Sequence, residues 1–127
     1  MNQENAPFLV VDDEPEMCWI LENILRKNGF TCMKAGSAQE AIALTELQPF
    51  RMAFLDAKLP DIDGLKLARK LRKLVPRLPI VIVSGYFYQD DATIEGALKS
   101  GLIAAFISKP FIHDEIARVI TLHAADR

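Results

Sequence analysis

Short apolar runs in this sequence end in, or lead into, polar side chains that can take part in phosphoryl chemistry. These side chains are carboxylates, a hydroxyl and an ammonium group, and they belong to Asp12, Asp13, Asp56, Ser84 and Lys109. Carboxylate oxygens are suited to a hard divalent cation such as Mg²⁺. A hydroxyl and an ammonium group can bind the oxygens of a phosphoryl group in transfer. Together these residue types are the parts that a phosphoryl-transfer site requires.

The apolar runs predict the strands that must position these side chains. Four of them, residues 8–11, 52–55, 80–83 and 103–107, have the length and composition of strands buried on both faces of a parallel sheet. Residues 30–33 form a fifth, weaker run. Asp12 and Asp56 each follow such a run directly, where a strand would leave the core.

Segments with helical spacing of apolar residues lie between and after these runs. They cover residues 15–27, 38–48, 65–74, 90–99 and 112–122. Ser37 precedes Gln39 and Glu40 in a capping-box pattern, and Gly29 can end the first helix. We expect Leu47 and Leu98 to point inward with the other apolar residues of their helices.

Strands that alternate with helices at these spacings predict an α/β fold with right-handed crossovers. The expected fold is a doubly wound, five-stranded parallel sheet flanked by five helices, of the flavodoxin-like class. Strand order 2-1-3-4-5 is common for five such units, although periodicity does not by itself establish it.

In a parallel sheet the carboxyl ends of the strands lie at one edge, so the polar residues should converge there. Three clustered carboxylates repel one another and need a cation. Lys109 supplies one positive charge, and Mg²⁺ would supply the rest. Each residue also has a simple structural explanation, with Asp13 as a helix cap, Ser84 as a turn former and Lys109 as a surface residue. Their combination favours the phosphoryl site.

Composition excludes several classes of protein. The 127 residues suffice for one domain, and a formal net charge of −2 does not indicate nucleic-acid binding. The sequence has neither a run of about 18 apolar residues that could cross a bilayer nor a secretory signal at its start. Cys18 and Cys32 lie far apart and lack the CxxC spacing of a metal site or redox pair. We expect both to be reduced thiols. We therefore expect a cytoplasmic protein that binds neither nucleic acid nor membrane directly.

The motifs resemble those of the response-regulator receiver domain of two-component signal transduction. The resemblance covers most of the chain and predicts a receiver domain at 7–124 with short tails at 1–6 and 125–127. The motifs that carry it are Asp12-Asp13 after FLVV, Asp56 in FLDAKLPDIDG, Ser84-Gly85 after IVIV, and Lys109-Pro110-Phe111.

The resemblance implies that Asp56 accepts a phosphoryl group from a histidine kinase or a histidine phosphotransfer protein. Asp13, Asp56 and the backbone carbonyl of Lys58 would bind Mg²⁺ or Mn²⁺ directly, and Asp12 would act through metal-bound water. Lys109 would pair with a phosphoryl oxygen. The domain would be a signalling phosphoacceptor rather than an enzyme, with intrinsic autophosphorylation and autodephosphorylation.

The resemblance also implies a conformational switch. Ser84 would move toward the phosphoryl group and Phe106 would turn inward, while Gly85, Tyr86 and Pro110 flank the site. The face built from the fourth helix, the fifth strand and the fifth helix would then bind a second copy or an effector.

This sequence is apolar at 102–105, where many relatives carry acids. Some of these residues are expected in the core and the others in an exposed apolar contact patch. We expect Ile103→Asp to disrupt the contacts of that patch.

Other interpretations stay open at this point. An aspartyl-nucleophile phosphatase would use the same metal, but it wants a DxD motif after the first strand, where this chain has Asp12-Asp13-Glu14. A flavodoxin-like flavin carrier would need a phosphate loop at that place rather than two acids. Within the receiver interpretation, the chain is either a single-domain regulator or the receiver of a larger regulator or hybrid kinase.

Overall fold

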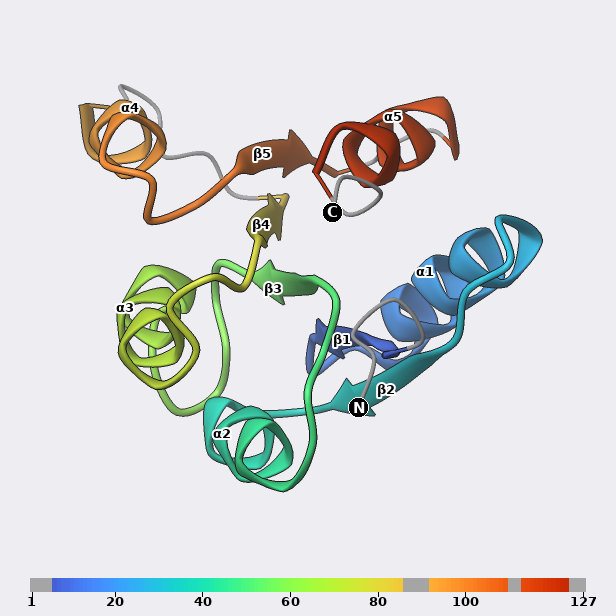
Figure 1. The fold of residues 1–127 in the computed structure, drawn as a ribbon, viewed down its shortest axis with the longest axis horizontal. Helices are drawn as coiled ribbons and strands as arrows, with labels where there is room; N and C mark the ends of the chain where they lie inside the picture. The colour runs from blue at the N-terminus through green and yellow to red at the C-terminus, as the bar shows by residue number, and fades with distance from the viewer. Residues whose placement is uncertain (1–5, 86–91, 110–112, 124–127) are drawn as a thin grey trace.

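A computed structural model describes residues 6–85, 92–109 and 113–123 (Figure 1). Strands and helices alternate along these residues as the sequence predicts. The elements are β1 (Phe8–Val11), α1 (Pro15–Lys27), β2 (Cys32–Ala35), α2 (Ala38–Leu47), β3 (Ala53–Asp56), α3 (Gly64–Leu74), β4 (Ile80–Ser84), α4 (Ala92–Lys99), β5 (Ala105–Ser108) and α5 (His113–His123).

The five strands form one parallel sheet in the order β2-β1-β3-β4-β5, which confirms the predicted fold class and strand order. Val10 lies opposite Phe54, Phe54 opposite Val81, and Val81 opposite Ala105. Because all strands run in the same direction, their carboxyl ends share one edge of the sheet, as the predicted site requires.

The sheet is covered by helices on both faces. Helices α2, α3 and α4 lie on one face and α1 and α5 on the other (Figure 1). Side chains along a strand alternate between the faces, so Leu9 and Val11 pack beneath the first group of helices and Phe8 and Val10 beneath the second. All residues of β1, β3 and β4 are buried, as expected for central strands of a parallel sheet.

The helix ends follow the predicted signals. Ser37 Oγ accepts a hydrogen bond from the Glu40 backbone N–H at 3.2 Å, and Glu40 Oε1 accepts one from the Gly36 N–H at 2.7 Å. Gly29 follows α1 with φ +87°, a left-handed conformation that glycine adopts without strain. Within the described residues, no helix is long and apolar enough to cross a membrane.

Two strands begin two residues later than predicted, β2 at Cys32 and β5 at Ala105. Before them, Phe30 is partly buried and Ile103 is buried, and neither residue is part of a strand. The Phe30 ring packs on the Phe8 ring with centroids 4.9 Å apart, and Ile103 is 1% exposed in the core. Ile103→Asp would therefore bury a charge rather than alter a contact patch, and the expectation for that variant was wrong. Leu102, Ala104 and Ala105 are partly exposed.

The inward orientation predicted for two leucines was also wrong. Leu47 is 78% exposed and Leu98 is 40% exposed. Both lie in the last turn of a helix, α2 for Leu47 and α4 for Leu98. Periodicity gives the spacing of apolar residues along a helix, but it does not show how far the neighbouring elements cover the last turn.

Candidate functional site

Three carboxylates meet at the carboxyl edge of the sheet. One oxygen each from Asp12, Asp13 and Asp56 lies within 4.8 Å of the others, the one such group of metal-ligand type among the described residues. Asp56 is the last residue of β3, and Asp12 and Asp13 follow β1. Asp12 and Asp56 are buried, whereas Asp13 is exposed, so the cluster opens to solvent on the Asp13 side.

Lys109, which follows β5, is the cation of this cluster. Its Nζ lies 3.1 Å from Asp12 Oδ2, 3.5 Å from Asp56 Oδ1 and 3.4 Å from Glu14 Oε1. Burial acts to lower the pKa of Lys109, but the hydrogen bond to Asp12 and the surrounding carboxylates outweigh burial and raise it. The ammonium group is therefore charged at neutral pH and bridges the ends of β1 and β3.

The cluster holds more negative than positive charge. Burial, and then the neighbouring charge of Asp12, raise the pKa of Asp56, while Lys109 acts against both. One ammonium group faces the three clustered carboxylates and Glu14. Oxygen donors that carry excess negative charge are the set that Mg²⁺ or Mn²⁺ prefers, so the residues present fit such an ion.

Ser84 and Gly85 lie next to this cluster at the end of β4. Ser84 is buried, and its backbone carbonyl accepts a hydrogen bond from the Lys109 N–H at 2.9 Å, which joins the ends of β4 and β5. A side chain at position 85 would meet the aliphatic part of Lys109 at 3.7 Å. Phe106 lies opposite Ile82 in the sheet and is partly buried against the core beneath α2, α3 and α4.

The loop from Ala57 to Asp63 closes tightly on the end of β3. The Gly64 N–H donates a hydrogen bond to the Ala57 carbonyl at 2.8 Å, and the backbones of Lys58 and Asp63 form an isolated antiparallel β-bridge. A Cβ atom at Gly64 would collide with the backbone oxygen of Asp56 and lie 2.9 Å from the Ala57 Cα. A residue without a side chain is therefore needed where α3 starts beside Asp56.

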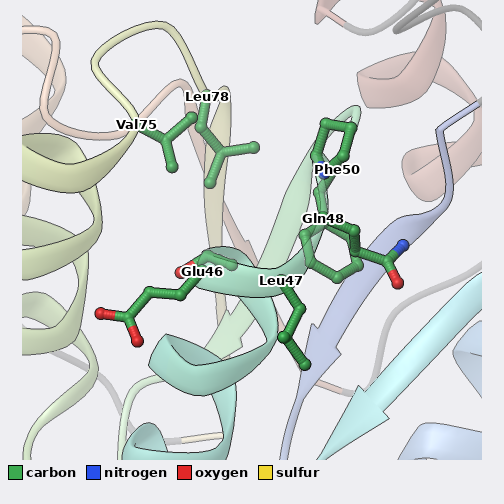
Figure 2. Close-up of a pocket in the computed structure, with 8 residues that line it drawn as sticks. Glu46, Leu47, Gln48, Phe50, Val75 and Leu78 are labelled. Atoms are coloured by element: carbon green, nitrogen blue, oxygen red, sulfur yellow. The ribbon is translucent and has the colours of Figure 1, made fainter. Parts of the chain in front are cut away.

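A pocket of about 200 Å³ lies at the opposite end of the sheet, between the end of α2 and the segment before β4 (Figure 2). Leu47, Phe50, Val75 and Leu78 contribute apolar walls, and Glu46 and Gln48 lie at its margin. Because its lining lacks both the carboxylate cluster and Lys109, we place the candidate site at the carboxyl edge.

Comparison with known proteins decides what kind of domain this is. The family model for the response regulator receiver domain matches residues 8–121. The chain belongs to the response regulator receiver family. This match favours the receiver interpretation, a signalling domain of two-component systems, over the phosphatase and flavin-carrier interpretations.

Relatives and solved structures agree with the family model. The transcriptional regulatory protein ZraR of Escherichia coli (strain K12) is 29% identical over 116 residues, which cover 91% of this chain and 26% of ZraR. The probable transcriptional regulatory protein TcrX of Mycobacterium tuberculosis is 34% identical over 108 residues, which cover 85% of this chain and 45% of TcrX. The receiver domain thus spans less than half of either relative.

Two receiver structures are similar over nearly their whole length. The receiver domain of NtrX from Brucella abortus is 32% identical, with a TM-score of 0.84 over 94% of this chain and 99% of that one. A CheY-like receiver domain from Methanospirillum hungatei JF-1 is 30% identical, with a TM-score of 0.82 over 92% of this chain and 91% of that one. Both support the architecture described above.

The structure brings most of the predicted site residues together. Asp12, Asp13, Asp56 and Lys109 form the charged cluster, and Ser84 lies at the same edge. Lys58 lies in the loop that follows Asp56. Tyr86 and Pro110, expected to flank the site, lie outside the described residues.

The contact between Glu14 and Lys109 was not predicted from the sequence. Glu14 was noted only as the acid after Asp12 and Asp13, yet its carboxylate approaches Lys109 at 3.4 Å. Its backbone N–H donates to Asp12 Oδ1 at 3.0 Å. The signal was its position directly after Asp13, because a third acid in succession at a strand end adds to the same cluster.

Proposed function

We propose that this receiver domain accepts one phosphoryl group on Asp56 from a histidine kinase or a histidine phosphotransfer protein, in a reaction that depends on Mg²⁺ or Mn²⁺. The contact of Lys109 Nζ with both Asp12 and Asp56, inside a group of three carboxylates, carries this proposal. A structural ion pair with Lys109 would need only one carboxylate. The three carboxylates grouped here leave negative charge uncompensated beside the oxygens of Asp56.

Asp56 is the proposed nucleophile. One of its carboxylate oxygens would form a bond to phosphorus while the bond from phosphorus to the histidine nitrogen of the donor breaks. The ammonium group of Lys109 already lies 3.5 Å from Asp56 Oδ1, so it would bind an oxygen of the incoming phosphoryl group without a large movement. Preorganised positive charge of this kind stabilises the charge that spreads over those oxygens.

The metal ion would be held by Asp13, Asp56 and the backbone carbonyl of Lys58, with Asp12 acting through water. When bound, the ion would neutralise part of the charge on the carboxylates and on the phosphoryl oxygens. Exposure of Asp13 leaves this side of the cluster accessible to solvent. The buried Asp12 carboxylate accepts hydrogen bonds from the Glu14 N–H and from the Lys109 ammonium group, and these bonds fix its orientation.

The read-out would pass through Ser84 and Phe106. Ser84 lies buried at the end of β4, and Phe106 lies in the neighbouring strand β5. Movement of the Ser84 hydroxyl toward the phosphoryl group would make room for the Phe106 ring and reshape the face of α4, β5 and α5. A second copy or an effector would bind this face through partly exposed apolar residues such as Leu102 and Ala105.

The functional unit of this proposal is the receiver domain at 7–124, acting in the cytoplasm. Acetyl phosphate with Mg²⁺ tests the chemistry, because it donates a phosphoryl group without a partner protein. Intact mass should show one added phosphoryl group on the wild type and none on Asp56→Asn. Asp114→Asn, which removes an exposed acid of α5, serves as the matched control and should react like the wild type. Equal phosphorylation of Asp56→Asn would refute the assignment.

A further inference from the structure

The loop that follows Asp56 is fastened to a neighbouring helix by a carboxylate that the proposed chemistry does not use. Asp61 Oδ1 accepts a hydrogen bond from the Ala38 backbone N–H, and Asp61 Oδ2 accepts one from the Gln39 N–H, each at 3.0 Å. Ala38 and Gln39 begin α2, more than twenty positions earlier in the chain. The two oxygens thus bind two successive N–H groups of another element.

The start of α2 is suited to this contact. The first N–H groups of a helix lack partners within the helix, and the helix dipole favours a negative charge beside them. Hydrogen bonds from these N–H groups, that of Ala38 foremost, lower the pKa of Asp61, so it is ionised at neutral pH. Ser37, which directly precedes α2, already accepts a hydrogen bond from the Glu40 N–H of that helix. The contact from Asp61 therefore differs from an ordinary cap, because it joins the loop to α2.

The other hydrogen bonds described for the loop act near its two ends, where Lys58 and Asp63 also form an antiparallel β-bridge. Asp63 Oδ1 accepts the Leu65 N–H at 2.7 Å, and the Gly64 N–H donates to the Ala57 carbonyl. These bonds fix where the loop leaves β3 and where it enters α3. Between them, at the outer part of the loop, Asp61 adds a polar link to α2.

We propose that Asp61 is a positioning residue that holds the 58–61 segment against α2, so that the Lys58 backbone carbonyl is kept in place for the metal ion. This inference rests on the proposed function, which assigns that carbonyl to the metal. It also couples metal binding to the start of α2, because a loop that the metal ion orders should hold the first N–H groups of α2 more firmly. By linkage, the coupling acts equally in both directions.

Metal affinity in four variants of the full chain tests the proposal, with free Mn²⁺ measured by electron paramagnetic resonance. Asp61→Ala removes both hydrogen bonds and should raise the dissociation constant about tenfold, the lower end of the range for partners that orient metal ligands. Asp61→Asn keeps one acceptor oxygen and should show a smaller increase. Ser37→Ala, the matched control, removes a cap of α2 without touching the loop and should bind like the wild type.

Asp13→Asn separates this inference from the proposed function. If it loses Mn²⁺ while both Asp61 variants bind like the wild type, the positioning role is overturned and the proposed function stands. If Asp13→Asn binds Mn²⁺ like the wild type, the proposed metal site itself is wrong, and the inference fails with it. Equal weakening by Asp61→Ala and Ser37→Ala would reduce Asp61 to a helix cap and would also overturn the proposal.

Hydrogen exchange provides a second measurement that a purely structural role would not change. In the wild type, Mg²⁺ should slow exchange of the Ala38 and Gln39 amides, because opening of their bonds to Asp61 becomes coupled to loss of the ion. In Asp61→Ala the same ion should leave both rates unchanged. Circular dichroism verifies that each variant is folded, and Asp61→Asn keeps the test available if Asp61→Ala does not fold.

Discussion

The two ends of the sheet differ in what they bury. At the carboxyl end, Asp12, Asp56 and Ser84 are buried polar side chains next to Lys109. At the amino end, the pocket between α2 and the segment before β4 has apolar walls, to which Phe50 contributes, beside polar ones from Glu46 and Gln48 (Figure 2). Burial of charge lowers stability unless the charges are paired. The grouped carboxylates of the carboxyl end therefore cost some stability, whereas the amino end contributes to the core.

A hollow lies at each end, because a second one of about 290 Å³ is lined by residues 57–63 of the loop that follows Asp56. The pocket at the amino end lacks the grouped charges of the carboxyl end. Substitutions at the amino end should leave phosphorylation intact whatever they do to stability, whereas substitutions at the carboxyl end should change phosphorylation.

Phe50→Ala should produce the largest change in stability. Phe50 is 6% exposed, and truncation would enlarge the pocket, so the free energy of unfolding should fall by about 3–5 kcal/mol. Urea unfolding followed by circular dichroism measures this loss. Phosphorylation by acetyl phosphate, per folded molecule, should stay at the wild-type rate. A slower rate in folded protein would mean that the two ends are not independent, and Phe50→Leu is the milder control.

Gly64→Ala should lower both stability and chemistry. The added methyl group would collide with the backbone of Asp56, and relief of such overpacking costs about 1–3 kcal/mol. The shift should displace the Asp56 carboxylate and slow phosphorylation. Gly96→Ala in α4 is the control, because nothing lies within 4 Å of its added methyl group. Wild-type phosphorylation of Gly64→Ala would show that the close contact is unimportant for the site.

Asp56→Asn should stabilise the metal-free protein at neutral pH, because it removes a buried charge that Asp12 repels and that Lys109 compensates only in part. Burial raises the pKa of Asp56, so its charged form weakens the fold. The gain should therefore be present above the raised pKa and disappear as the pH falls below the ordinary aspartate pKa, where both folded and unfolded wild type are protonated. Mg²⁺ should reduce the difference in stability between Asp56→Asn and the wild type, because it binds the folded wild type. A variant less stable than the wild type in EDTA would contradict this account.

Leu47→Ser should have the smallest effect. The side chain lines the pocket at the amino end but is 78% exposed, so the free energy of unfolding should change by less than about 0.5 kcal/mol. Thermal unfolding is sensitive enough to detect a larger change. Such a change would show that Leu47 covers the core at the amino end, as its helical spacing had suggested.

The features that follow from general rules were predictable from the sequence. Unbroken apolar runs identified β1, β3 and β4, because strands buried on both faces need apolar residues at every position. Once the sheet is parallel, Asp12, Asp56 and Ser84 must share an edge, and the structure places them there. The grouping of carboxylates therefore followed from where the strands end.

The contacts between elements were not predictable in the same way. The bonds from Asp61 to α2 depend on how a loop lies against a helix that precedes it by more than twenty residues, and the spacing of residues does not encode that. The approach of Glu14 to Lys109 likewise depends on the turn after β1. Exposure of Leu47 depends on the elements around the end of α2, which periodicity within α2 cannot show.

The most direct test of the central claim is to identify the residue that carries the phosphoryl group. After reaction with acetyl phosphate and Mg²⁺, borohydride reduces an aspartyl phosphate to homoserine, which tandem mass spectrometry locates in the sequence. This account predicts homoserine at position 56 and unmodified aspartate at positions 12 and 13. Homoserine at position 12 or 13, or phosphorylated protein in which position 56 is unmodified, would contradict it.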